Sequence, residues 1–117
     1  MRILEFRGKK DGRWVSLNLF SGVSDAIDIE TIGQFTGLYD CNEKEIYEGD
    51  ILKYIHWENK EEVLYYITFE DEMGSFVLQK PLLKRKINIT QMEIYGLKLE
   101  VIGNIHDNPE LLNLTKK

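Results

Sequence analysis

Carboxylate pairs are the residues of this chain with the greatest capacity for chemistry. They occur in four places: Glu43/Glu45, Glu48/Asp50, Glu61/Glu62 and Glu70/Asp71/Glu72. Two carboxylates that converge in a cleft can act as general acid and base, or can hold a divalent cation. Each pair also lies in a stretch of turn-like composition, where carboxylates commonly accept backbone hydrogen bonds. We favour the structural interpretation, with a small hydrolase or metal-dependent enzyme as the alternative.

The two histidines and the single cysteine do not indicate a catalytic or metal site. His56 and His106 both fall in or at the end of expected strands, and their spacing is not that of a metal site. Cys41 is the only cysteine, and Lys44 is the only cation near it in the sequence, so we expect an inert thiol and no disulfide. The sequence has no phosphate-binding glycine loop and no nucleophile elbow. We therefore expect no cofactor, no metal ion and no enzymatic activity.

A basic segment is the main candidate for binding nucleic acid. It contains Lys80, Lys84, Arg85 and Lys86, with Leu82 and Leu83 between them. Lysine and arginine neutralise phosphates, and nearby aromatic side chains can stack on bases. The alternative function that follows is a nucleic-acid-associated protein.

Charge is distributed unevenly along the chain. Residues 1–20 hold five basic and two acidic side chains, residues 21–75 hold three and fourteen, and residues 76–117 hold seven and four. The acidic middle argues against phosphate binding there. It predicts either that an acidic region of one subunit meets the basic segment of another, or that both basic ends fold beside the middle within one subunit.

Alternation of apolar and polar side chains predicts a mainly β fold. Residues 62–69 are the clearest strand, with β-branched and aromatic residues at a period of two. Together with residues 51–57 and 75–79 they predict a three-stranded meander in which 62–69 is central. A last strand at 100–105 closes the sheet.

The N-terminal part is expected to form a hairpin. Residues 2–7 and 14–20 alternate, and residues 8–12 have the composition of the turn between them. Residues 29–38 read as extended, with a bend or bulge at Thr36-Gly37. Residues 24–26 fit either a helical turn or a loop.

The sequence of the C-terminal part fits more than one secondary structure. Residues 87–89 alternate like a strand, whereas residues 92–99 fit either a helical turn or a strand. Residues 110–114 are expected to form a short helical turn after Asn108-Pro109. Helical content is therefore predicted to be minor.

Residues 34–55 organise the rest of the chain. A polar turn at residues 40–44 separates two apolar stretches, and Glu48-Gly49-Asp50 precedes the apolar run that begins at Ile51. Glycine allows a sharp corner, where we expect Gly49 either to take a positive φ or to face a neighbour too close for a Cβ. Asp50 can bond to the backbone just after it. Glu48 is expected to pair with a neighbouring basic group. A Gly-Asp pair that opens an apolar strand is typical of small SH3-like barrels.

Three sequence blocks resemble the YopX family of phage and prophage proteins. Residues 34–38 (Gln-Phe-Thr-Gly-Leu) and 44–51 (Lys-Glu-Ile-Tyr-Glu-Gly-Asp-Ile) resemble its central signature. Residues 5–8 (Glu-Phe-Arg-Gly) resemble its opening, and residues 101–112 resemble its closing block almost residue for residue. The family commonly has Asn-Gly in the central turn, where this chain has Asn42-Glu43. The residues that carry the signature are Thr36, Gly37, Tyr47, Glu48, Gly49, Asp50, Gly103 and Asn104.

The resemblance implies a phage- or prophage-encoded protein, but the family has no established activity to transfer. We expect one domain over residues 1–117, with a small SH3-like barrel, an N-terminal hairpin and minor helical turns. No apolar run reaches the length of a membrane helix, and we expect a cytoplasmic protein of a bacterial host cell. The favoured function is a non-enzymatic binding or assembly module. Its expected partner is a second copy of the chain or an unidentified host or phage protein.

Overall fold

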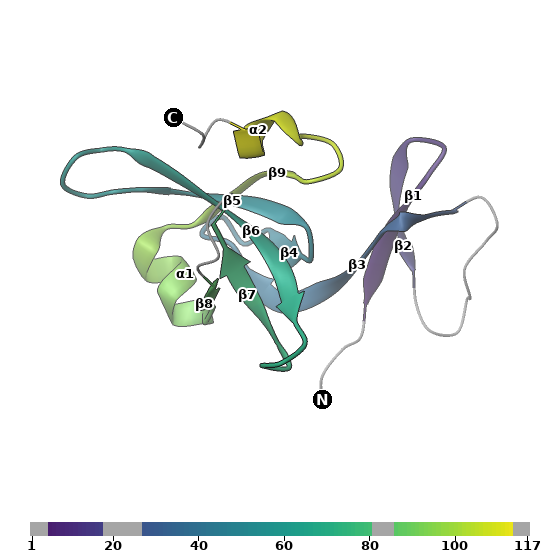
Figure 1. Ribbon diagram of the computed structural model, residues 1–117, viewed down its shortest axis with the longest axis horizontal. Helices are drawn as coiled ribbons and strands as arrows, with labels where there is room; N and C mark the ends of the chain where they lie inside the picture. Colours follow the sequence, from purple (N-terminus) through teal and green to yellow (C-terminus); the bar gives the residue numbers. More distant parts are fainter. Residues whose placement is uncertain (1–4, 18–26, 81–85, 114–117) are drawn as a thin grey trace.

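The protein is mainly β, with two sheets and two short helices, in a computed structural model that describes residues 5–17, 27–80 and 86–113 (Figure 1). A four-stranded sheet has the order β2-β1-β3-β4, and a five-stranded sheet has the order β8-β7-β6-β5-β9. The five-stranded sheet curls into a half-barrel. The first two strands and the start of β3 form a lobe at the right of Figure 1, and β3 continues from this lobe to the centre of the molecule, where it pairs with β4.

The expected N-terminal hairpin is present, but the bounds of its strands differ from those expected. It consists of β1 (Phe6–Lys10) and β2 (Arg13–Leu17). Asp11 and Gly12 form the turn, with φ values of 52° and 79°, as a tight type I′ turn requires. The turn lies within the expected range of residues 8–12, but its expected start is wrong, because residues 8–10 belong to β1 and pair with β2. The part of the hairpin expected at residues 2–4 and 18–20 lies outside the described residues, as do residues 24–26.

The longest strand is β3 (Ile27–Tyr39), which pairs with β1 and with β4 (Glu45–Tyr47). Its register with β4 shifts between Phe35 and Tyr39, which confirms the irregularity expected at Thr36-Gly37. The following turn closes around Asp40, whose Oδ1 accepts hydrogen bonds from the amides of Asn42 and Lys44.

The predicted meander is confirmed in β5 (Asp50–Ile55), β6 (Glu62–Glu70) and β7 (Ser75–Gln79). Strand β6 is central and antiparallel to both neighbours. On the far side of β5 lies β9 (Glu100–Asn104), and on the far side of β7 lies β8 (Lys86–Asn88). The core contains Ile46, Leu52, Ile67, Phe76, Leu78, Ile94 and Leu99.

Residues 92–99, which fit either a helix or a strand, lie mostly in helix α1 (Gln91–Leu97). Thr90 caps this helix, because its Oγ1 accepts a hydrogen bond from Glu93 N at 3.2 Å. Only Ile94 of the helix is fully buried. A second short helix, α2 (Glu110–Asn113), follows Pro109 as expected.

The basic ends of the sequence do fold beside its acidic middle. Arg7 forms an ion pair with Asp50, and Lys86 forms one with Glu70. Both contacts join segments of opposite net charge within one chain. They favour the second of the two explanations for the uneven charge.

Candidate functional site

Strand β1 places the side chain of Arg7 between two aromatic rings. Its guanidinium carbon lies 4.3 Å from the centre of the Trp14 ring and 4.5 Å from that of Tyr47. The same guanidinium forms an ion pair with Asp50 at the start of β5. Arginine suits this position, because its planar group stacks on rings and pairs with a carboxylate at its edge. The contact fixes the four-stranded sheet to the five-stranded sheet.

Asp50 is buried at this junction, with a side chain that is 2% exposed. Its Oδ2 accepts a hydrogen bond from Tyr47 N at 2.8 Å. Burial raises the pKa of Asp50, although the charge of Arg7 and the Tyr47 amide both oppose that rise. The bond to the backbone expected at this corner therefore exists, but to the residue three positions before Asp50.

Asp107 forms a second contact between the ends of the chain. Its carboxylate pairs with Lys9 and accepts hydrogen bonds from Trp14 Nε1 at 2.8 Å and Asn104 Nδ2 at 3.0 Å. These three donors lower the pKa of Asp107 to about 2. The His106 ring lies 6.0 Å from that of Trp14. Trp14 thus contacts two residues of the closing block, His106 and Asp107.

Gly103 and Asn104 shape that closing block. A Cβ added to Gly103 would lie 2.5 Å from Asn108 Oδ1, so the close approach requires glycine. Asn104 Oδ1 accepts hydrogen bonds from the amides of His106 and Asp107, at 3.0 and 2.9 Å. These bonds orient Asp107 toward β1 and β2.

Gly49 has a positive φ of 92°, one of the two alternatives expected for it. Its amide donates to Ile67 O, and its carbonyl accepts from Ile105 N, both at 2.8 Å. Among the described residues, Glu48 has no basic partner of the kind expected, and its Oε1 accepts a hydrogen bond from Gln34 N at 3.4 Å. The nearby cation, Arg7, pairs with Asp50 instead, because that carboxylate lies at the inter-sheet junction.

Thr36 and Gly37 lie further from the junction, at the irregularity of β3. Thr36 Oγ1 donates to Ile46 O at 2.7 Å and accepts from Leu38 N at 3.1 Å. Gly37 has a φ of 83°. These two signature residues lie where the register between β3 and β4 shifts.

Most signature residues therefore meet at one structural junction. The sequence identified Tyr47 and Asp50 but not Arg7, which contacts both, or Trp14, on which Arg7 stacks. The signal for Arg7 was present in the opening block, whereas no local pattern marked Trp14. The chemistry of the junction is that of ion pairs and stacked rings that connect two sheets.

The basic segment is only partly described. Lys84 and Arg85 lie outside the described residues. Lys86 begins β8 and forms an ion pair with Glu70, which lowers the pKa of that carboxyl group. Lys80 is partly exposed at the end of β7. The pairing of Lys86 reduces the positive charge that this segment can offer to phosphates.

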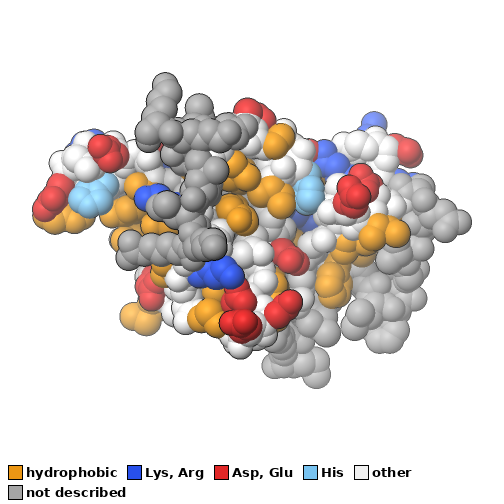
Figure 2. All heavy atoms as spheres, viewed as in Figure 1, with side chains coloured by type: hydrophobic (Ala, Val, Ile, Leu, Met, Phe, Trp, Pro, Cys, Tyr) orange, Lys and Arg blue, Asp and Glu red, His pale blue; other side chains and the backbone are white. Residues whose placement is uncertain are grey.

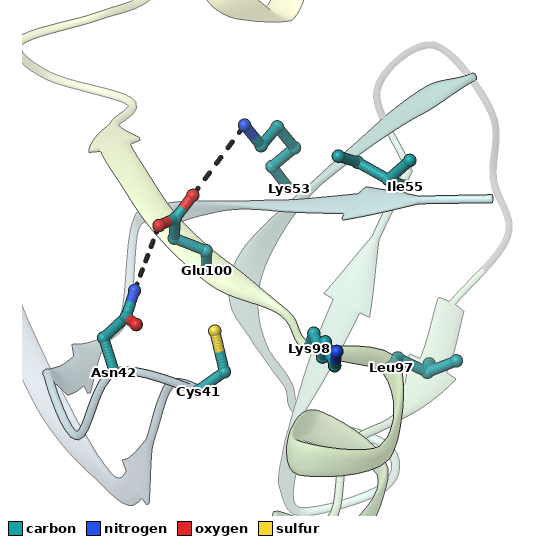
Figure 3. A pocket seen from close by; sticks show the side chains of 7 residues that line it. All are labelled: Cys41, Asn42, Lys53, Ile55, Leu97, Lys98 and Glu100. Carbon is teal, nitrogen blue, oxygen red and sulfur yellow. Dashed lines mark hydrogen bonds and ion pairs between the residues drawn. The ribbon is translucent and has the colours of Figure 1, made fainter. Parts of the chain in front are cut away.

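A pocket of about 260 Å³ opens beside strands β5 and β9 of the five-stranded sheet (Figure 3). It lies between the turn after β3, strands β5 and β9, and the end of α1. Lys53 and Glu100 face each other at 3.7 Å, and Asn42 Nδ2 donates to Glu100 at 3.0 Å. Burial raises the pKa of the Cys41 thiol, and Asp40 and Glu100 add to this rise. Its lining residues are Cys41, Asn42, Lys53, Ile55, Leu97, Lys98 and Glu100.

Exposed apolar side chains are found on the β5–β6 hairpin and on α1, the elements that contribute Ile55 and Leu97 to this pocket. Figure 2 shows hydrophobic side chains at the free end of the β5–β6 hairpin and beside α1. Met92 is 86% and Trp57 72% exposed, and Ile55, Tyr95 and Leu97 are between 44% and 49% exposed. The Tyr95 hydroxyl donates to Glu43 at 3.0 Å, which places it beside the turn after β3. Large apolar side chains grouped in this way commonly mark an interaction surface.

The described residues offer no group of three or more His, Cys, Asp and Glu side chains that could hold a metal ion. A smaller hollow of about 150 Å³ lies between the sheets and contains Glu30, Glu48 and His106 among its lining residues. Within residues 5–17, 27–80 and 86–113, no helix is long and apolar enough to cross a membrane.

The fold and the junction together define a class of mainly β protein in which a small N-terminal sheet is tied to a half-barrel. The sequence pattern described as "YopX protein" matches residues 3–113, so the chain belongs to the YopX family. It is similar to the crystal structure of protein EF1440 from Enterococcus faecalis, at 30% sequence identity and a TM-score of 0.57. That similarity covers 94% of this chain and 75% of the other. No protein of curated function matches the chain.

Proposed function

We propose that this protein is a non-enzymatic binding or assembly module that acts through the surface around the Cys41–Leu97 pocket. The observation that carries the proposal is the set of exposed apolar side chains on the two elements that border that pocket: Ile55 and Trp57 on the β5–β6 hairpin, and Met92, Tyr95 and Leu97 on α1. Aromatic residues and methionine are enriched in the cores of protein interfaces. Such residues are costly to leave in water unless a partner covers them.

The size of the pocket supports a protein partner over a small substrate. Sites for small molecules usually measure about 300–1,000 Å³ and enclose most of the ligand. This pocket is about 260 Å³, and it combines the apolar side chains of Ile55 and Leu97 with charged ones at Lys53, Lys98 and Glu100. That volume and lining suit one or two inserted side chains of another chain.

The setting proposed for this module is the cytoplasm of a bacterial cell, with the gene carried by a phage or prophage. Membership of the YopX family supports this origin, and the similarity to a protein from Enterococcus faecalis supports the bacterial host. The five-stranded half-barrel is proposed to be of the SH3-like kind, because a β5–β6–β7 meander is followed by a strand that returns to β5.

Nucleic-acid binding through residues 80–86 is less well supported. The ion pair of Lys86 with Glu70 neutralises part of that segment, and Glu70 lies on the central strand of the sheet. Strong binding to a duplex needs several unneutralised cations.

The proposal is tested by measuring what the purified protein binds. Its molar mass is determined by light scattering over a range of concentrations, and the immobilised protein is exposed to extract from phage-infected cells. We expect self-association or specific retention of another protein. Met92→Glu should reduce either one, whereas Met73→Glu, on the exposed β6–β7 turn, should not. A monomer that retains nothing would refute the proposal.

A further inference from the structure

The free end of the β5–β6 hairpin carries an exposed tryptophan. Trp57 is 72% exposed, and its ring stacks on that of His56 at an angle of 12°. The turn is closed by hydrogen bonds from His56 N to Glu61 O and from Lys60 N to His56 O, both at 2.9 Å. The turn that carries Trp57 is thus closed by its own backbone hydrogen bonds. Tryptophans presented in this way are enriched among the residues that dominate binding energy.

The Cys41–Leu97 pocket provides a matching recess on the same chain. Ile55, two residues before Trp57, lines the pocket together with Leu97 from the end of α1 (Figure 3). The pocket volume of about 260 Å³ is below that of typical small-molecule sites but is adequate for a large side chain. One hairpin end therefore supplies both a projecting ring and a wall of a recess.

We infer that two copies of the chain associate through these hairpins, with Trp57 of each copy inserted into the Cys41–Leu97 pocket of its partner. An interface of this kind is isologous: the contact made by one copy is repeated by the other around a two-fold axis. The inference rests on the proposed binding or assembly function and names its partner as a second copy.

Charge complementarity supports a second copy as the partner. The turn beside Trp57 carries Glu58, Glu61 and Glu62 against one cation, Lys60. The pocket carries Lys53 and Lys98 against one carboxylate, Glu100. Insertion of Trp57 would bring the net negative turn of one copy to the net positive rim of the other. The same chain thus contains both halves of the complementary pair.

The strength of the association follows from the area available. An inserted tryptophan buries about 150–250 Å², and the exposed Met92 and Tyr95 of α1 extend the apolar surface. Stable interfaces bury about 800 Å² on each partner, which two tryptophans alone do not provide. We therefore expect a reversible dimer with a dissociation constant on the order of 10 μM.

Sedimentation equilibrium over concentrations below and above that range tests the inference. We expect the wild type to change from monomer to dimer, and Trp57→Ala to weaken the dimer at least tenfold. Met73→Ala is the matched control, since Met73 is 50% exposed on a different turn, and it should leave the dimer unchanged. Circular dichroism should show the same fold in each variant.

A charge exchange tests the geometry independently. Glu58→Lys and Lys98→Glu should each weaken the dimer, and the two together should restore part of the loss if these residues face each other across the interface.

Fluorescence from Trp57, obtained by subtracting the spectrum of Trp57→Phe, should shift to shorter wavelength as the dimer forms.

The outcomes separate this inference from the proposed function. A protein that stays monomeric but retains another protein in a Met92-dependent manner would overturn the inference and leave the proposed function standing. A dimer that is unchanged by Trp57→Ala would place the interface elsewhere and would also overturn the inference. A monomer that retains nothing refutes both.

Discussion

Removal of the Arg7 charge is the sharpest test of the inter-sheet junction. In Arg7→Met the replacement still fills the space between Trp14 and Tyr47, but Asp50 loses its ion pair while its side chain stays buried. Removing one partner of a buried ion pair typically costs about 3–5 kcal/mol. Arg7 itself is 16% exposed, so some solvent reaches the pair, and we expect a cost near 3 kcal/mol, at the lower end of that range.

The loss of stability in Arg7→Met should depend on pH. Burial already raises the pKa of Asp50, and the loss of Arg7 should raise it further. A carboxyl group with a raised folded-state pKa is penalised only when it ionises, so the penalty grows as pH rises above its unfolded value near 4. The deficit of Arg7→Met relative to the wild type should therefore be largest at pH 7 and should shrink toward pH 4.

Urea unfolding followed by circular dichroism measures both effects. The double variant Arg7→Met/Asp50→Asn serves as the control, because the amide oxygen of asparagine can still accept the bond from Tyr47 N. It should be more stable than Arg7→Met alone at pH 7, since no charge is left buried. If Arg7→Met costs less than about 1 kcal/mol, or if the double variant is no more stable, the junction does not depend on this ion pair.

Three further predictions concern the corner, the closing block and the thiol. Gly49→Val should cost about 1–3 kcal/mol in urea unfolding because valine disfavours a φ of 92°; a neutral result would contradict the strained corner. Asp107 has a pKa of about 2, below its unfolded value, so its contribution to stability is complete above about pH 4 and is lost as pH falls through 2. Asp107→Asn should flatten that part of the stability–pH curve, and an unchanged curve would exclude the role of Lys9 and Trp14. The raised pKa of Cys41 predicts slower alkylation at pH 7 than for a free thiol, with acceleration at higher pH, and a fast reaction at pH 7 would contradict it.

Local sequence pattern was sufficient for most strands. The period of two in residues 62–69 and the flanking turns predicted the meander, because alternating side chains on a strand can bury only one face. Gly49 was predicted to have a positive φ or a close neighbour from its place between two apolar runs, and it has the positive φ. The boundaries at the N-terminal hairpin were wrong because residues 8–10 have turn-like composition but pair with β2, and residues 9 and 10 also pair with β3.

Tertiary packing decided the rest. Residues 92–99 fit two local structures, and the burial of Ile94 and Leu99 against the five-stranded sheet accompanies the helix. The contact of Arg7 with Trp14, Tyr47 and Asp50 brings together four strands, and the pocket combines the turn after β3 with the end of α1. The sequence by itself determined most of the extended segments and turns, since those depend on neighbours a few positions away. Which charged and aromatic side chains meet depends on how distant segments pack around one core, and only the tertiary structure determined that.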